Sequence, residues 1–232
     1  MLKITRQNLR TPGPTPVPDD IVEAMSNPMI DHRGPEFLEI ITAATERLKQ
    51  VFMTRNDTYI LTSSGTGGLE AAIVNTLSPG DKVLSASAGS FGDRFTEMAQ
   101  AYNADVQCLA FEWGEAIDPD VIRSALRADP EIKAVLVTHN ETSTGVTHPL
   151  EAVAKVVKGE FNKLLLVDAV SSLACIPLPV DAWGCDVVAT ASQKGFMVPP
   201  GLAFVTMSQT AWQAQKTATM PRYYFDLETA QR

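Results

Sequence analysis

Short apolar runs that alternate with helical stretches restrict the fold of this 232-residue chain more than any other feature. From residue 58 onward, each run is followed by a segment of helical pattern, as 58–63 is followed by 66–77. Strands buried on both faces of a parallel sheet read as continuous apolar runs. The sequence therefore predicts an α/β fold, with a mostly parallel sheet of the seven-stranded type and helices on both faces. The expected strands are 58–63, 82–87, 106–111, 132–138, 163–169, 186–191 and 202–207.

The two ends of the chain depart from this alternation. Residues 1–20 are rich in Pro and Thr, and because alternating prolines disfavour a helix, we expect an extended N-terminal arm. Residues 21–210 contain all the expected strands and are predicted to form one large domain. Residues 211–232 begin with a helical pattern and stop without another strand, so we expect them to start a connection toward a further, smaller domain.

Charge and cysteine content exclude several classes of protein. The formal net charge is −8, which argues against a nucleic-acid-binding protein or one that binds anionic membranes. No run of about 18 apolar residues occurs, so no membrane span is expected. The three cysteines are few and widely spaced, with no CxxC pair, which favours a reducing, cytoplasmic location and predicts no metal site.

A Gly-rich turn, SSGTGG at 63–68, lies between an expected strand and an expected helix. Glycines let backbone N–H groups approach an anion, and a helix start adds unpaired donors and the positive end of its dipole. Ser64, Gly65 and Thr66 are therefore candidate phosphate ligands. By itself the motif is weak, since a plain turn with a helix cap reads the same way, and it matches neither GK[ST] nor GxGxxG.

Two charged residues follow later strands. Asp168 ends the run KLLLVD, and Lys194 follows DVVATA within the segment SQKG. Ligands of open α/β sheets bind at the carboxyl ends of the strands, where both residues are expected. Taken singly, Asp168 is equally a turn or cap residue, and Lys194 is more often a solvated lysine.

Together, the three features match the parts of a site for pyridoxal 5′-phosphate (PLP). The Gly-rich turn would hold the phosphate, and Asp168 would pair with the protonated pyridine nitrogen. Lys194 would form a Schiff base with the aldehyde and then act as the base, because desolvation or a nearby cation frees its amine.

Seven stretches of the chain carry a resemblance to a known family. The sequence resembles the class V aminotransferases of PLP fold type I, and is most similar to the alanine/serine–glyoxylate aminotransferases. The resemblance covers most of residues 10–230. Its stretches are TPGPTPVP (11–18), DHRGPEF (31–37), SSGTGGLEAAIVNTLSPGD (63–81), GSFGDRF (89–95), THNETSTGV (138–146), LLLVDAVSSL (164–173) and ASQKGFMVPPGLAFV (191–205).

The resemblance implies further site residues. Phe91 would stack on the cofactor ring, Val170 would pack on its other face, and Thr142 would hydrogen-bond its phenolic oxygen. Gln193 would help to hold the phosphate, and Gly13 would lie near the substrate. Each has a structural alternative: core packing for Phe91 and Val170, and a turn for Thr142 and Gly13.

The resemblance also implies a reaction and partners. Residues 21–210 would be the PLP-binding large domain of a homodimeric aminotransferase. The enzyme would move an amino group from alanine or serine to glyoxylate or another 2-oxo acid. Family members also carry a C-terminal small domain with an arginine for the substrate carboxylate, and a Tyr/Thr-containing segment that reaches the partner subunit's phosphate. Neither region lies in residues 1–232, so we expect the chain to be incomplete.

Two other functions remain open at this point. One is a PLP-dependent lyase or cysteine desulfurase on the same fold, although Cys175 and Cys185 lie in apolar, strand-like contexts that do not suit a mobile catalytic cysteine. The other is a truncated relative that binds PLP without turnover.

Overall fold

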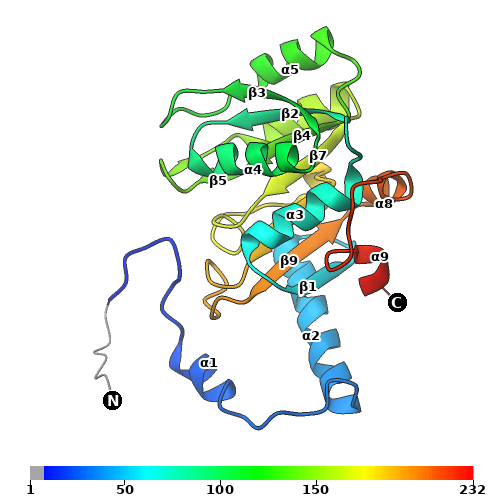
Figure 1. Cartoon of the computed structure of the whole chain (residues 1–232). Coiled ribbons are helices and arrows are strands. Elements are labelled where there is room, and N and C mark those ends of the chain that lie inside the picture. Colours follow the sequence, from blue (N-terminus) through cyan, green and yellow to red (C-terminus); the bar gives the residue numbers. More distant parts are fainter. Residues whose placement is uncertain (1–7, 232) are drawn as a thin grey trace.

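A single seven-stranded sheet forms the centre of the computed structural model, which describes residues 8–231 (Figure 1). The strand order is β1-β9-β8-β7-β4-β2-β3. β9 is antiparallel to β1 and β8, and the other neighbouring pairs are parallel, which confirms the predicted fold class. The strands are β1 (Thr58–Thr62), β2 (Lys82–Ser87), β3 (Asp105–Ala110), β4 (Ala134–Thr138), β7 (Leu164–Asp168), β8 (Val187–Ala191) and β9 (Leu202–Met207), and β5 (Asn140–Glu141) pairs with β6 (Val146–Thr147) in a separate hairpin.

Helices cover both faces of the sheet and divide the core into two clusters. One cluster packs α2, α5, α6, α7 and the π-helix η1 against one face. The other packs α3, α4, α8 and α9 against the opposite face. The helices are α1 (Asp19–Ala24), α2 (Pro35–Phe52), α3 (Gly65–Thr76), α4 (Ser90–Ala101), α5 (Pro119–Ala128), α6 (Leu150–Ala154), η1 (Lys155–Glu160), α7 (Val180–Trp183), α8 (Gln209–Gln215) and α9 (Leu227–Ala230).

The central strand β7 shows why the strands read as unbroken apolar runs. Leu164 and Leu166 belong to one core cluster, whereas Leu165 and Val167 belong to the other. Successive side chains of a strand point to opposite faces, so a strand covered on both faces needs an apolar residue at every position. The continuous pattern in the sequence is therefore a direct consequence of the two helical layers.

The longest helix, α2, was not predicted. It spans 18 residues, begins with Pro35 after Gly34, and buries only Leu48 and Phe52 at its end. Its buried and half-buried apolar side chains, Phe37, Ile41, Ala44, Leu48 and Phe52, recur at helical spacing, but exposed apolar residues such as Leu38 and Ile40 interrupt that pattern in the sequence. The helix nevertheless starts with a proline, which is well placed in a first turn.

The N-terminal segment has little regular structure of its own. Residues 8–18 form neither helix nor strand, and the short α1 buries none of its residues. In Figure 1, α1 lies away from the sheet. No helix within residues 8–231 combines the length and the apolar character that crossing a bilayer requires.

The topology brings distant segments of the sequence to one edge of the sheet. β1, β2, β7 and β8 all run in the same direction, because β9 alone is reversed. The residues that follow these strands therefore meet at the edge where the strands end. Open α/β sheets bind ligands at this edge.

Candidate active site

A small pocket at this edge collects most of the predicted site residues. Its volume is about 140 Å³. All the predicted cofactor-binding residues except Thr142 line it, together with Leu69 and Arg94, which were not predicted. The lining residues are Ser64, Gly65, Thr66, Leu69, Phe91, Arg94, Asp168, Val170, Gln193 and Lys194.

The Gly-rich turn supplies one wall of the pocket as the start of α3. Ser64 caps the helix, with its Oγ accepting a hydrogen bond from the Gly67 N–H at 3.5 Å. A Cβ on Gly65 would lie only 2.7 Å from Val170 Cγ2, so this turn approaches Val170 as closely as a glycine permits. The exposed first turn of a helix and the hydroxyls beside it suit a phosphate group.

Asp168 places a buried carboxylate on the floor of the pocket, at the end of β7. Its side chain is 3% exposed, and its Oδ1 accepts a hydrogen bond from the Val170 N–H at 2.8 Å. Within residues 8–231 this carboxylate forms no ion pair. Burial raises the pKa of Asp168 to about 6, the Val170 N–H opposes this rise, and the negative charge of Glu141 adds to it. A buried carboxylate of this kind is complementary to a ligand that brings its own positive charge.

Lys194 reaches the same pocket from the turn after β8. Burial lowers the pKa of its amine, and the negative charge of Asp168 opposes this effect. The backbone around it is tied to the N-terminal arm, because Thr15 N–H donates to the Gln193 carbonyl at 3.0 Å and Thr15 Oγ1 to the Lys194 carbonyl at 3.1 Å. The neighbouring Gln193 has a buried Oε1 that finds no hydrogen-bond partner among the described residues.

Gly13 lies directly against Lys194. A Cβ at Gly13 would be 2.5 Å from Lys194 Cδ and 2.8 Å from the Gln193 carbonyl oxygen, and the backbone φ of Gly13 is +154°. A side chain at this position would therefore displace the lysine. The contact brings the Pro-rich arm to the pocket across about 180 residues of sequence.

α4 carries the aromatic wall of the pocket. Phe91 lies in its first turn and is half-buried. Arg94, one turn further along, holds its guanidinium carbon 5.0 Å from the centre of the Phe91 ring. The positive charge of Arg94 also lowers the pKa of Asp168. Arg94 lies three residues after Phe91, so the two side chains share one face of the helix. This spacing was the signal in the sequence that would have identified Arg94.

Thr142 is the predicted cofactor-binding residue that the pocket does not include. It lies in the turn after β5, is half-buried, and is absent from the pocket lining. Its predecessor Glu141 is completely buried, and that carboxylate contacts the start of α4. The short β5–β6 hairpin therefore lies beside the start of α4, next to Phe91.

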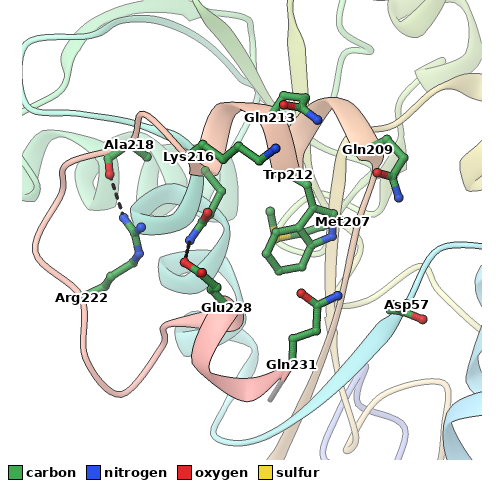
Figure 2. Close-up of a pocket in the computed structure, with 11 residues that line it drawn as sticks. Asp57, Met207, Gln209, Trp212, Gln213, Lys216, Ala218, Arg222, Glu228 and Gln231 are labelled. Carbon is green, nitrogen blue, oxygen red and sulfur yellow. Dashed lines mark hydrogen bonds between the residues drawn. The ribbon is translucent and has the colours of Figure 1, made fainter.

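A larger cavity between α8 and α9, of about 570 Å³, shares no residue with this pocket (Figure 2). Two of its charged side chains, Glu228 and Arg222, bond to neighbouring groups of the protein. Glu228 accepts from Gln215 Nε2 at 3.3 Å, and Arg222 donates to the Ala218 carbonyl at 3.0 Å (Figure 2). The smaller pocket, which joins an amine, a buried carboxylate and a Gly-rich helix start, is therefore the candidate active site.

Comparisons with known proteins find a matching family and several relatives. The family model described as Aminotransferase class-V matches residues 8–220. The chain is 48% identical to the "Soluble hydrogenase 42 kDa subunit" of Anabaena cylindrica, over 94% of this chain and 58% of that protein. It is 44% identical to the L-aspartate–glyoxylate aminotransferase of Paracoccus denitrificans, over 97% of this chain and 58% of that protein.

A solved structure matches over the whole described fold. It is the alanine–glyoxylate aminotransferase of a Nostoc species, with a TM-score of 0.94 and 35% sequence identity. The match covers 99% of this chain and 61% of that one. The chain thus spans about three-fifths of the length of the relatives it matches.

Proposed function

The chain belongs to the class V aminotransferase family, and on that basis we propose that it moves an amino group from a small amino acid to glyoxylate or another 2-oxo acid. The cofactor of the family is PLP. The proposed donors are alanine or serine. The chain spans 58% of the length of these relatives, so the activity of the whole protein is itself a proposal.

The pairing of Asp168 with Lys194 in one pocket is the observation that carries the proposal. Asp168 is a buried carboxylate without an ion-pair partner within residues 8–231, and Lys194 is an amine whose pKa is lowered by burial. When bound, PLP supplies an aldehyde that accepts an amine and a protonated ring that withdraws electrons from the bond being broken. These two residues have the charge and the reactivity that such a group needs.

The other lining residues fit the remaining parts of the cofactor. Ser64, Gly65 and Thr66 would hold the phosphate at the start of α3, and the side-chain NH₂ of Gln193, which lines the same pocket, would donate to it. Phe91 and Val170 would contact the faces of the ring. The hydrogen bond proposed for Thr142 with the phenolic oxygen stays a prediction, since Thr142 does not line the pocket.

Lys194 has a second proposed role in proton transfer. A lysine serves as a general base when burial reduces its affinity for a proton, because the free amine is then present near neutral pH. Lys194 Nζ would remove the proton from Cα of the amino-acid substrate and hold it during the reaction. Gly13, whose missing side chain leaves room beside Lys194, would border the substrate.

The names of the relatives support glyoxylate as the acceptor more strongly than any one donor. Relatives named for aspartate, serine and ureidoglycine as donors all share glyoxylate. We therefore propose glyoxylate first among the acceptors. The donor should be identified by measuring half-reactions with single amino acids.

A lyase or cysteine desulfurase remains the alternative in another reaction class. Solved cysteine desulfurases match with a TM-score of 0.68 at 17% identity, which is a likeness of fold alone. The structure corrects one premise about the cysteines: Cys175 is exposed in a turn after β7, not in a strand, whereas Cys185 is buried. A truncated relative that binds PLP without turnover is the other alternative. An amino-acid-dependent change in the cofactor spectrum, with or without keto-acid product, discriminates these functions.

We further propose that the protein is a cytoplasmic homodimer. The family resemblance is one reason for this proposal. The other is that apolar side chains are exposed along the N-terminal segment and α2, among them Met29 (96% exposed), Leu38 (65%) and Ile40 (57%). Contact with a second copy would remove this surface from water. Light scattering of the complete protein that detects only monomer at micromolar concentration would contradict the dimer.

The proposed division of the chain follows from the same family. Residues 1–20 would be an arm that reaches the pocket, and 21–210 the PLP-binding large domain. Residues 211–232 would begin the connection toward a small domain.

The decisive experiment is to map the lysine that binds the cofactor. Protein incubated with PLP and reduced with borohydride should carry the label on the peptide that contains Lys194. Lys163→Arg and Lys216→Arg are matched controls that should keep the label, whereas Lys194→Arg should lose it. A label on Lys163 or Lys216 in the unmodified protein would disprove the site assignment.

A further inference from the structure

Glu141 is a completely buried carboxylate that the proposed reaction does not use. Its two oxygens accept hydrogen bonds from four donors: the backbone N–H groups of Phe91 (3.1 Å to Oε2 and 3.3 Å to Oε1), Gly92 (3.0 Å) and Ser143 (3.0 Å), and Ser143 Oγ (2.6 Å). Charged acceptors form stronger hydrogen bonds than neutral ones. The carboxylate therefore joins the turn after β5 to the start of α4.

The start of α4 depends on this carboxylate because the helix has no cap of its own. The residue before the helix, Gly89, has no side chain to accept a hydrogen bond. The first N–H groups of a helix need acceptors from elsewhere. Glu141 accepts from Phe91 and Gly92, and Ser143 Oγ accepts from the Ser90 N–H at 3.1 Å.

Gly89 also provides the space that the carboxylate occupies. A Cβ at Gly89 would lie 2.6 Å from Glu141 Cγ and Cδ, and 2.5 Å from Ser143 Oγ. No other residue type fits there without moving Glu141. A residue 50 positions later in the sequence thus caps α4 in place of a local Ser, Thr or Asp.

The capped turn carries Phe91 into the candidate active site. Phe91 is both the residue whose N–H binds Glu141 and an aromatic wall of the pocket. Thr142, the residue predicted to bind the phenolic oxygen of the cofactor, directly follows Glu141. A single buried carboxylate therefore lies between the backbones of two residues to which the resemblance gives contacts with the cofactor.

We infer that Glu141 is a positioning residue. By capping the start of α4, it fixes Phe91 in the position from which the ring would contact the cofactor. This inference rests on the proposed function of the same site. Glu141 acts through Phe91, and its loss should alter the way in which the cofactor is held as well as the stability of the protein. The effect should therefore appear in the signals of the bound cofactor.

The first test uses the complete gene product without cofactor. Glu141→Gln keeps the shape of the side chain but has one acceptor oxygen in place of two, and its NH₂ group faces backbone donors. Amide hydrogen exchange should become faster in the peptide around 89–95. Asp118→Asn is the matched control, because Asp118 caps α5 by accepting from the Asp120 N–H at 2.8 Å and does not line the pocket.

The second test follows the bound cofactor. In Glu141→Gln we expect the dissociation constant of PLP to rise by about tenfold, because binding must then also order the loosened turn that carries Phe91. The visible circular dichroism per bound PLP should also decrease, since it reports the asymmetric surroundings of the ring. Ser143→Ala removes one contact to Glu141 from an exposed residue, and it should shift both signals in the same direction by less.

The outcomes separate this inference from the proposed function. Asp118→Asn should leave both cofactor signals unchanged, since Asn caps a helix about as well as Asp and this cap does not line the pocket. Normal PLP affinity and dichroism in Glu141→Gln, with or without faster exchange, would overturn the positioning role and leave the proposed function intact. Failure of the unmodified protein to bind PLP on any lysine would refute the proposed function, and the inference with it.

Discussion

Replacing Asp168 by Asn should stabilise the cofactor-free protein, although it removes a central residue of the proposed site. Burial raises the pKa of this carboxyl from 3.8 to about 6 in the folded protein. The folded state therefore binds a proton more tightly than the unfolded state, and the stabilisation from that proton is present below about pH 4. It is lost as the pH rises through about 6, because the buried carboxylate must then be ionised.

The size of the effect follows from the pKa. At about 1.4 kcal/mol per pH unit, the ionised carboxylate costs about 3 kcal/mol of unfolding free energy near pH 8. Asn carries no charge, and its Oδ1 can still accept the Val170 N–H. Its buried NH₂ group adds a cost that does not depend on pH. The informative quantity is therefore the change with pH in the stability difference between the variant and the unmodified protein.

Urea unfolding of both cofactor-free proteins at several pH values measures this difference. From about pH 4 to about pH 8 it should move in favour of Asp168→Asn by about 3 kcal/mol. With PLP present the order should reverse, since the variant lacks the charge that pairs with the ring nitrogen, binds PLP more weakly and removes the substrate proton more slowly by orders of magnitude. A stability difference that is the same at both pH values would refute the reasoning about Asp168.

Three further predictions follow from contacts in the structure. Gly13→Ala puts a methyl group 2.5 Å from Lys194 Cδ, so PLP titration should show weaker binding; an unchanged dissociation constant would contradict this. Asp186→Ala leaves the Lys158 ammonium, 2.7 Å away, without its buried partner, and should lower the unfolding free energy by about 3–5 kcal/mol; an unchanged urea midpoint would count against it. Residues 1–232 alone should transfer amino groups from alanine to glyoxylate far more slowly than a protein of the relatives' full length, and equal turnover would refute this prediction.

The positions of the strands were predictable because burial on both faces leaves a direct mark on the sequence. Six of the seven expected apolar runs contain a strand of the sheet, and the seventh, 106–111, overlaps β3 with a shift of one residue. The helix α2 left a weaker mark: Phe37, Ile41, Ala44, Leu48 and Phe52 recur at helical spacing, but only Leu48 and Phe52 are fully buried. Exposed apolar residues between them, such as Leu38 and Ile40, obscure the pattern in the sequence.

The active-site residues divide in the same way. Asp168 and Lys194 follow strands that run in the same direction, so the expected fold was enough to bring them to one edge of the sheet. Arg94 and Glu141 were missed, although both lie in motifs that resemble the family. The spacing of Arg94 from Phe91 puts both on one helix face and could have identified Arg94. No local pattern shows that Glu141 faces the start of α4.

The sequence by itself determined the fold class and the places of the strands along the chain. It also determined the strand ends at which the site residues were expected. Only the tertiary structure decided which backbone donors surround Glu141, that Gly13 touches Lys194, and that Thr142 is outside the pocket. The reason is physical: strand burial repeats along the chain and is local, whereas these contacts join segments that are many residues apart. They depend on the exact separation of two packed elements, which no local pattern of residues records.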